Sequence, residues 1–236
     1  KNFPFNALEF CLRSANLDIQ DIDLVAYYEK PSIKFTRLLA SYIANFPKGY
    51  SSFNRVFPEW LSKNLNFKSK LRNYLNYSKD IFFCPHHISH MSSAYYPSPF
   101  LSSAIVTMDG VGEWTTLGVG QGKDNKISML KKINFPHSLG LFYSAFTHYC
   151  GFKVNSGEYK LMGLAPYGEP TFLNKILNNM IDIKDDGSFL LNMKYFDYDL
   201  NENMINDFFE QLFQNPRRKS ESELTKFYMD IASSVQ

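Results

Sequence analysis

Cysteine is scarce in this 236-residue chain. Cys11, Cys84 and Cys150 are odd in number, far apart and without a Cys-x-x-Cys pair. This pattern excludes a disulfide framework and predicts buried, reduced thiols in a cytoplasmic protein. Apolar runs near the ~20 residues that span a bilayer are also missing. The opening residues lead straight into a polar amphipathic segment, so we expect neither a membrane helix nor a secretory signal.

The chain also lacks a large excess of positive or negative charge. The 25 basic and 23 acidic residues leave a net charge of +2. The one compact basic cluster, 217–219, is too short for a nucleic-acid footprint, so no nucleic-acid partner is expected. What the chain does have is a 44% hydrophobic fraction with 17% aromatic residues. This composition and length predict a substantial core in one large domain or two small ones.

The spacing of apolar residues predicts a mixed α/β fold. The predicted helices are Phe5–Ala15, Phe35–Phe46, Glu59–Leu75, His86–Tyr96, Ser138–Tyr149, Phe172–Ile181, Asn203–Phe213 and Ser222–Val235. The predicted strands are Leu24–Tyr28 (stopped at Pro31), Asp80–Cys84, Ser103–Met108, Trp114–Gln121, Ile127–Ile133 and Phe189–Leu191. The three strands between 103 and 133 read as an antiparallel meander. Residues 158–168 read as irregular, because glycine and proline interrupt them.

A histidine cluster lies at the junction of a strand and a helix, in the segment Cys84-Pro85-His86-His87-Ile88-Ser89-His90. His86 and His90 are four residues apart, so on a helix their Cβ atoms lie roughly 5–6 Å apart on one face and can hold one ion. His87 is turned about 100° away from that face. Glu does not follow His86, which excludes the zinc-protease helix motif. The alternative is that these are helix-terminus histidines satisfied by hydrogen bonds.

Asp109 ends the next predicted strand and is followed by Gly110-Val111-Gly112. We therefore predict a divalent-metal site formed by His86, His90 and Asp109. The glycine turn exposes backbone N–H groups that can cradle a phosphate beside a metal-bound carboxylate. An ordinary hairpin turn is the alternative for this turn taken alone.

The segment from Gly157 to Gly168 is the third candidate. Glu158 is suited to accept hydrogen bonds from ribose hydroxyls, and Lys160 to neutralise a phosphate. Glycines such as Gly163 allow the backbone to approach a ligand closely. A structured surface loop with an incidental charge pair explains the same residues equally well.

Several blocks of the sequence together resemble a known family. They are Phe83-Cys84-Pro85-His86-His87-Ile88-Ser89-His90, Ser93-Ala94-Tyr95-Tyr96-Pro97-Ser98-Pro99-Phe100, Met108-Asp109-Gly110-Val111-Gly112-Glu113-Trp114, Phe135-Pro136-His137-Ser138-Leu139-Gly140-Leu141-Phe142-Tyr143, and the segment from Gly157 to Gly168. In this order they resemble the bacterial O-carbamoyltransferases of the nodulation-protein U, cephamycin and tobramycin type. The resemblance covers nearly the whole chain.

The resemblance implies a lobe of the actin-like ATPase and sugar-kinase (ribonuclease H-like) superfamily with helical insertions. In such enzymes a His-x-x-x-His pair and carboxylates hold a metal that contacts the phosphate of an acyl-adenylate. His86, His90 and Asp109 match that pattern, and Gly110, Val111, Gly112, Glu158, Lys160 and Gly163 are the expected nucleotide-binding residues. The metal would be iron first, with zinc or manganese as the other choices.

The implied reaction starts from ATP and carbamoyl phosphate. A C-terminal YrdC-like domain of the same protein would make carbamoyl-adenylate, and the metal-binding domain would pass the carbamoyl group to the hydroxyl of a small-molecule acceptor. No general base is assigned, and the acceptor is open among aminoglycosides, lipo-oligosaccharides, nodulation factors and antibiotic precursors.

The chain is expected to cover less sequence than the proteins of this family. We expect residues 1–236 to be part of the N-terminal domain, lacking its opening strand, with 222–236 beginning a second lobe. The chain alone is then expected to be inactive. Its last helix would lack a packing partner and expose an apolar stripe that consists of Leu224, Phe227, Tyr228, Ile231 and Val235.

Two other functions fit parts of the pattern. A mononuclear iron oxygenase uses two histidines and a carboxylate, but it predicts a β-barrel and a different order of ligands. A nucleotide- or metal-binding module without turnover would keep the same residues without catalysis.

Overall fold

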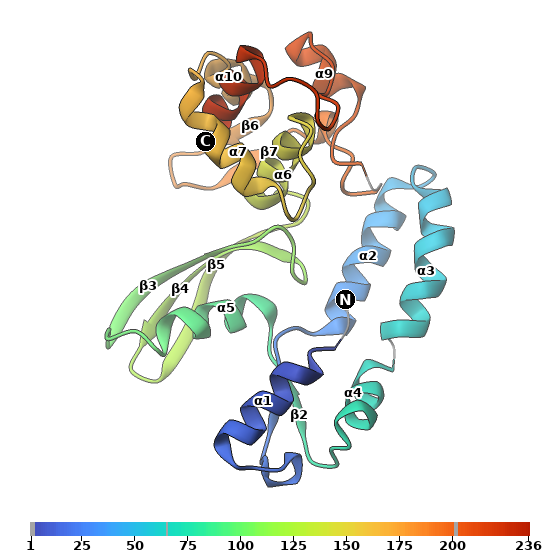
Figure 1. Cartoon of the computed structure of the whole chain (residues 1–236), viewed down its shortest axis with the longest axis vertical. Coiled ribbons are helices and arrows are strands. Elements are labelled where there is room, and N and C mark those ends of the chain that lie inside the picture. Colours follow the sequence, from blue (N-terminus) through green and yellow to red (C-terminus); the bar gives the residue numbers. More distant parts are fainter. Residues whose placement is uncertain (1–2, 65, 201–202) are drawn as a thin grey trace.

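The computed structural model describes residues 3–64, 66–200 and 203–236 and mixes helices with short strands (Figure 1). Three parts follow one another along the chain: an N-terminal part, a central meander with one helix on it, and a C-terminal helical lobe. The actin-like class implied by the resemblance stays a prediction, as does the beginning of a second lobe at residue 222.

The N-terminal part pairs two short parallel strands among helices. Its elements are α1 (Phe5–Ala15), η1 (Ile19–Asp21), β1 (Val25–Tyr27), α2 (Pro31–Asn45), α3 (Tyr50–Asn64), α4 (Phe67–Leu75) and β2 (Ile81–Phe83). Val25 lies opposite Ile81 in the parallel pair. A small core of Leu71, Leu75, Tyr77 and Ile81 joins α4 to these strands. The pair ends directly before the histidine segment and therefore positions it.

Two sequence predictions in this part are wrong. Pro31 does not merely stop a strand but starts α2, because proline's fixed φ suits the first helical position. The single helix predicted for Glu59–Leu75 is two helices, α3 and α4, and the first of them already begins at Tyr50. Leu65, between them, lies outside the described residues.

The central meander is antiparallel, as the sequence predicts. It consists of β3 (Ser102–Met108), β4 (Thr115–Lys123) and β5 (Lys126–Asn134), with α5 (His86–Tyr95) against one face. Ile105 and Thr107 are buried under α5, whereas Val106 and Met108 are exposed on the other face. This alternation follows from the two-residue period of a strand. Hydrogen bonds of His86 with Asp109 and of His87 with Thr107 place the end of β3 beside the start of α5.

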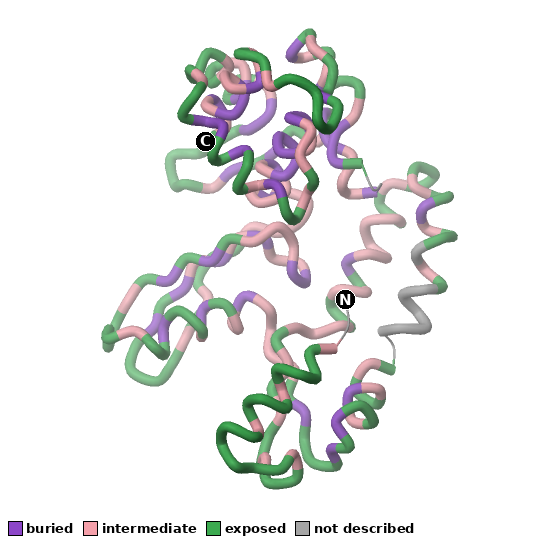
Figure 2. The backbone as a smooth tube through the Cα atoms, in the orientation of Figure 1, coloured by how far each residue is buried: buried purple, intermediate pink, exposed green. Residues whose placement is uncertain are grey.

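The C-terminal lobe holds most of the core. Its elements are α6 (Leu139–Tyr149), α7 (Glu158–Leu164), η2 (Ala165–Tyr167), α8 (Leu173–Asn179), β6 (Ile181–Ile183), β7 (Phe189–Leu191), η3 (Met193–Tyr195), α9 (Asp207–Phe213) and α10 (Lys226–Val235). Figure 2 shows that many buried residues lie in this lobe, whereas the residues of α1 are largely exposed. Phe146, Tyr149 and Phe209 are fully buried at its centre, with Phe146 edge-on to Phe209.

Three predictions fail in this lobe. Residues 158–167 are helical rather than irregular, because Gly163 lies on an exposed position of α7 while Gly157 and Gly168 lie outside the helical stretch as the caps of α7 and η2. Residue 181 begins β6 instead of ending a helix. The apolar stripe of α10 is packed rather than exposed, since Tyr228 and Ile231 join the core that α6, α7 and α8 build.

The cysteines are all free, as predicted, but only Cys150 is buried. Burial raises the pKa of its thiol to about 12, which makes it unreactive. Cys11 is exposed, because it lies on the outer side of α1, so the prediction of burial is wrong there. Within the described residues, no helix is both long and apolar enough to cross a bilayer.

The C-terminal core yields a stability prediction. Phe146→Ala removes a ring with no exposed surface and should lower the free energy of unfolding by about 3–5 kcal/mol. Urea denaturation measures the change, with Phe10→Ala as control because Phe10 is 72% exposed. Equal midpoints for the two variants would contradict the packing described here.

Candidate metal centre

His86, His90 and Asp109 come together at one point, as the sequence predicts, although Asp109 is 23 residues away from His86. We call these three residues the His–His–Asp centre. His86 Nε2 lies 2.5 Å from Asp109 Oδ2 and 3.0 Å from His90 Nε2, and His90 Nε2 lies 3.7 Å from the same carboxylate oxygen. Two imidazole nitrogens and one carboxylate oxygen therefore face a common position.

These separations suit a shared cation. Imidazole and carboxylate atoms bind zinc at about 2.0–2.2 Å, so neighbouring ligand atoms lie about 3.0–3.5 Å apart around the ion. The three observed distances bracket that range. His86 and Asp109 are mostly buried, whereas the side chain of His90 is 50% exposed and leaves one side of the centre open. Iron, zinc and manganese all accept this mixture of ligands.

The carboxyl group of Asp109 is held ionised. Burial alone would raise its pKa, but the hydrogen bond with His86 and the electrostatic effect of His86 and His90 outweigh burial and lower it. An ionised carboxylate is the form that binds a metal.

His87 is excluded from the centre, as the helical geometry predicts. Its Nε2 lies 2.8 Å from the carbonyl oxygen of Thr115 and its Nδ1 lies 2.7 Å from the hydroxyl of Thr107. Because a carbonyl only accepts, Nε2 carries the proton and Nδ1 accepts from the hydroxyl. Burial lowers the pKa of His87, which keeps this ring neutral. Both of its nitrogens are occupied in attaching α5 to the meander.

The position of the His86 ring depends on a glycine. A Cβ atom added to Gly112 would lie 2.0 Å from the His86 Cδ2 atom, so the backbone at Gly112 packs directly against the imidazole. His86 Nδ1 is buried and has no hydrogen-bond partner among the described residues. Packing, rather than a hydrogen bond at Nδ1, therefore orients this ring.

Ser138 anchors the other side of the same turn. Its fully buried hydroxyl lies 3.0 Å from the carbonyl oxygen of Asp109 and 2.6 Å from that of Gly110, and it accepts from Leu141 N at the start of α6. Gly140 lies so close that a Cβ there would be 2.7 Å from Gly110 N. The N-terminus of α6 thus holds the turn in place.

The turn also presents backbone donors. Within the described part of the chain, the amides of Gly110, Val111 and Gly112 donate to no protein acceptor. Such a run of unpaired N–H groups is suited to an anion.

The predicted residues Glu158, Lys160 and Gly163 lie elsewhere, on α7 of the C-terminal lobe (Figure 1). The Glu158 carboxylate accepts from Ser144 Oγ and from the amides of Asn155 and Gly157, which organises the start of the helix. Lys160 is exposed beside a hollow of about 300 Å³ that Lys153 and Arg218 also line. The structure does not bring these residues into the His–His–Asp centre.

Sequence reasoning missed two buried charged residues near the centre. Glu113 accepts a short hydrogen bond from the amide of Lys30, which ties the turn to the start of α2. Arg37, on α2, is buried with its guanidinium carbon 4.8 Å from the centroid of the Phe135 ring. The sequence pattern gave no signal for Arg37, because it lies opposite the apolar stripe of Phe35, Leu38 and Tyr42 on the predicted helix.

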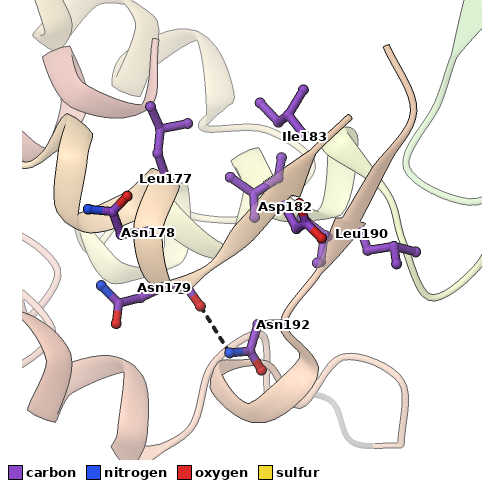
Figure 3. Close-up of a pocket in the computed structure, with 9 residues that line it drawn as sticks. Leu177, Asn178, Asn179, Asp182, Ile183, Leu190 and Asn192 are labelled. Atoms are coloured by element: carbon purple, nitrogen blue, oxygen red, sulfur yellow. Dashed lines mark hydrogen bonds between the residues drawn. The ribbon is translucent and has the colours of Figure 1, made fainter. Parts of the chain in front are cut away.

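A hollow of about 640 Å³ lies away from the centre, between α8 and the β6–β7 pair (Figure 3). Its polar groups serve the fold: the side-chain amide of Asn192 donates to the carbonyl of Asn179, and Asp182 pairs with Lys184. Leu177, Ile183 and Leu190 supply apolar walls. The described residues that line it include a carboxylate, Asp182, but no histidine, so they do not form a second site like the His–His–Asp centre.

The packing of Gly112 gives a sharp test. Gly112→Ala should displace the His86 ring and lower metal affinity at least tenfold, because the new methyl group would overlap the imidazole. Gly163→Ala is the matched control: its Cβ meets no atom within 4 Å, and it should stabilise α7 by roughly 0.5–1 kcal/mol. Titration with Mn²⁺ or Zn²⁺ measures both. Unchanged metal binding by Gly112→Ala would refute the role given to this contact.

Glu158 yields a prediction about pH. Burial raises the pKa of its carboxyl, but the amides of Asn155 and Gly157 and the Ser144 hydroxyl more than offset this and lower it below the usual 4.5. The charged form therefore stabilises the fold above pH 4.5, and the contribution disappears as pH falls through the lowered pKa.

We accordingly expect Glu158→Ala to cost about 1–2 kcal/mol at neutral pH and progressively less in acid. Thermal unfolding at several pH values measures this difference, with Glu169→Ala as control because that side chain is 75% exposed. A loss of stability independent of pH would contradict the assignment.

Comparison with known proteins adds a family. The sequence model of the family described as "Carbamoyltransferase N-terminus" matches residues 1–236. A Synechocystis protein, described only as uncharacterized, is 47% identical over the whole chain, which spans 40% of that protein.

Two rhizobial proteins are also similar. The nodulation protein NolNO of Sinorhizobium fredii is 30% identical over 79% of the chain and 26% of its own length. The nodulation protein NolO of Bradyrhizobium diazoefficiens is 34% identical over 46% of the chain and 20% of its own length. The chain thus spans two fifths or less of these relatives. With the family match over all 236 residues, the chain belongs to the carbamoyltransferase N-terminus family.

Proposed function

We propose that this chain forms the metal-binding part of an O-carbamoyltransferase. The observation that carries the proposal is the convergence of two imidazole nitrogens and one carboxylate oxygen on one position. Membership of the carbamoyltransferase family supports the reaction class. The activated substrate is carbamoyl-adenylate, which is made from ATP and carbamoyl phosphate.

The residues of the centre have separate tasks in this proposal. His86, His90 and Asp109 hold the divalent metal, iron or alternatively zinc or manganese, and the bound ion supplies Lewis acidity and a template for the phosphate. Unpaired amides of Gly110, Val111 and Gly112 donate to phosphate oxygens, because they are fixed by Ser138 and need not reorganise.

The transfer itself forms one bond and breaks one. The acceptor hydroxyl oxygen attacks the carbamoyl carbon, the bond from that carbon to the phosphate oxygen breaks, and AMP leaves with the negative charge. The hydroxyl proton passes to a base that is not assigned here. Donors that face the phosphate favour this step because charge develops there.

Other parts of the protein complete the reaction. We propose that Glu158, Lys160 and Gly163 on α7 contact the nucleotide, Lys160 being exposed and free of the helix contacts that occupy Glu158. A YrdC-like domain of the same full-length protein supplies the carbamoyl-adenylate. The acceptor is a small hydroxylated molecule.

The test uses the full-length protein with ATP, carbamoyl phosphate and a panel of hydroxylated acceptors. Mass spectrometry should detect an acceptor that has gained one carbamoyl group, and the double variant His86→Ala/His90→Ala should lose both this product and the bound metal. His87→Ala is the control: it should keep the metal while lowering the melting temperature, because both ring nitrogens of His87 bind the meander.

Each other outcome has a meaning. Equal metal content in the double variant and the wild type would eliminate the His–His–Asp centre. Metal and nucleotide binding without any product would favour the binding module. Consumption of oxygen would favour the iron oxygenase.

A further inference from the structure

Arg37 is a buried cation, and two of its three guanidinium nitrogens have no hydrogen-bond partner among the described residues. Its side chain is only 6% exposed, and within residues 3–64, 66–200 and 203–236 neither Nε nor Nη1 has a hydrogen-bond partner. Phe135 covers one face of the guanidinium at 4.8 Å but accepts nothing from the N–H groups at its edge. Unpaired buried charges cost free energy, so a fold that keeps one invites a functional explanation.

The surroundings of Arg37 connect it to the His–His–Asp centre. Phe135 begins the segment that leads to Ser138, whose hydroxyl holds the carbonyl oxygens of Asp109 and Gly110. On the other side, the amide of Lys30 at the start of α2 donates to Glu113, which closes the same turn. Figure 1 shows α2 running beside the end of the meander. The turn and the helix that carries Arg37 are thus tied together at both sides.

The pKa of Arg37 agrees with its position near the centre. Burial lowers the pKa of Arg37 to about 10, while the charges of Glu29 and Asp109 act in the opposite direction. The guanidinium therefore stays charged at neutral pH. Neither carboxylate comes within ion-pair distance of it in the part of the chain that the structure describes, and Glu29 instead pairs with Lys34. The charge of Asp109 therefore acts on Arg37 without forming an ion pair with it.

We propose that Arg37 binds an anion at this site: its Nε and Nη1 groups donate to a phosphoryl oxygen of the nucleotide-activated substrate. The proposal rests on the proposed function and adds a binding residue to it. A guanidinium offers parallel N–H donors that match phosphate geometry. The unpaired amides of the 110–112 turn would contact the same group from another side.

The test compares full-length wild type with Arg37→Met, which keeps a long apolar side chain under Phe135 but removes the donors. With Mn²⁺ present, calorimetry should give an AMP dissociation constant at least tenfold higher for the variant, and Arg37→Lys should fall between. Adenosine, which lacks the phosphate, should bind both proteins equally. Arg13→Met is the matched control, because it removes a cation that is 77% exposed on α1.

A second measurement separates this role from a structural one. Without ligand, Arg37→Met should melt at the same temperature or higher, because the lost Nε and Nη1 groups make no hydrogen bonds. A lower melting temperature, or equal losses of AMP and adenosine affinity, would assign Arg37 to folding and overturn the proposal. Unchanged AMP affinity, or no AMP binding by the wild type, would overturn it too.

The two proposals fail in different ways. Carbamoyl transfer by the wild type with unchanged AMP affinity in Arg37→Met would remove the role of Arg37 and leave the proposed function standing. Loss of AMP affinity in Arg37→Met without transfer by the wild type would do the reverse.

Discussion

The close packing of the 109–112 turn against the His86 imidazole is the contact on which the rest of the centre depends. Because residue 112 has no side chain, the backbone approaches the ring directly and brings the Asp109 carboxylate to His86 Nε2. His90 joins without further help, since it lies one helical turn away on the same face. A bulkier residue at 112 would separate the two halves of the site while leaving each half folded.

Three attachments hold the elements around this contact in place. His87 ties α5 to β3 and β4 through both ring nitrogens, Ser138 fixes the turn from the start of α6, and Glu113 ties it to α2. Each of these attachments uses a buried polar group, which is costly to leave unpaired. Together they hold the Asp109 carboxylate and the backbone amides of the turn in position before an ion or a substrate binds.

The balance of charge around the centre is uneven. The Asp109 carboxylate interacts with the histidines. Arg37 on α2 is buried and has no ion-pair partner among the described groups. Together with the row of unpaired amides, this cation makes the site attractive to anions. Such a field matches the phosphate of the activated substrate that we propose.

The sequence alone determined what depends on local spacing. The His86–His90 pair, the exclusion of His87 and the meander follow from the periods of helix and strand, which the backbone imposes wherever those elements form. The tertiary structure alone decided which distant groups meet. It packed α10 into the core, directed Glu158 to its own helix and set Arg37 against Phe135. Such contacts depend on how side chains fill the space between elements rather than on any short pattern.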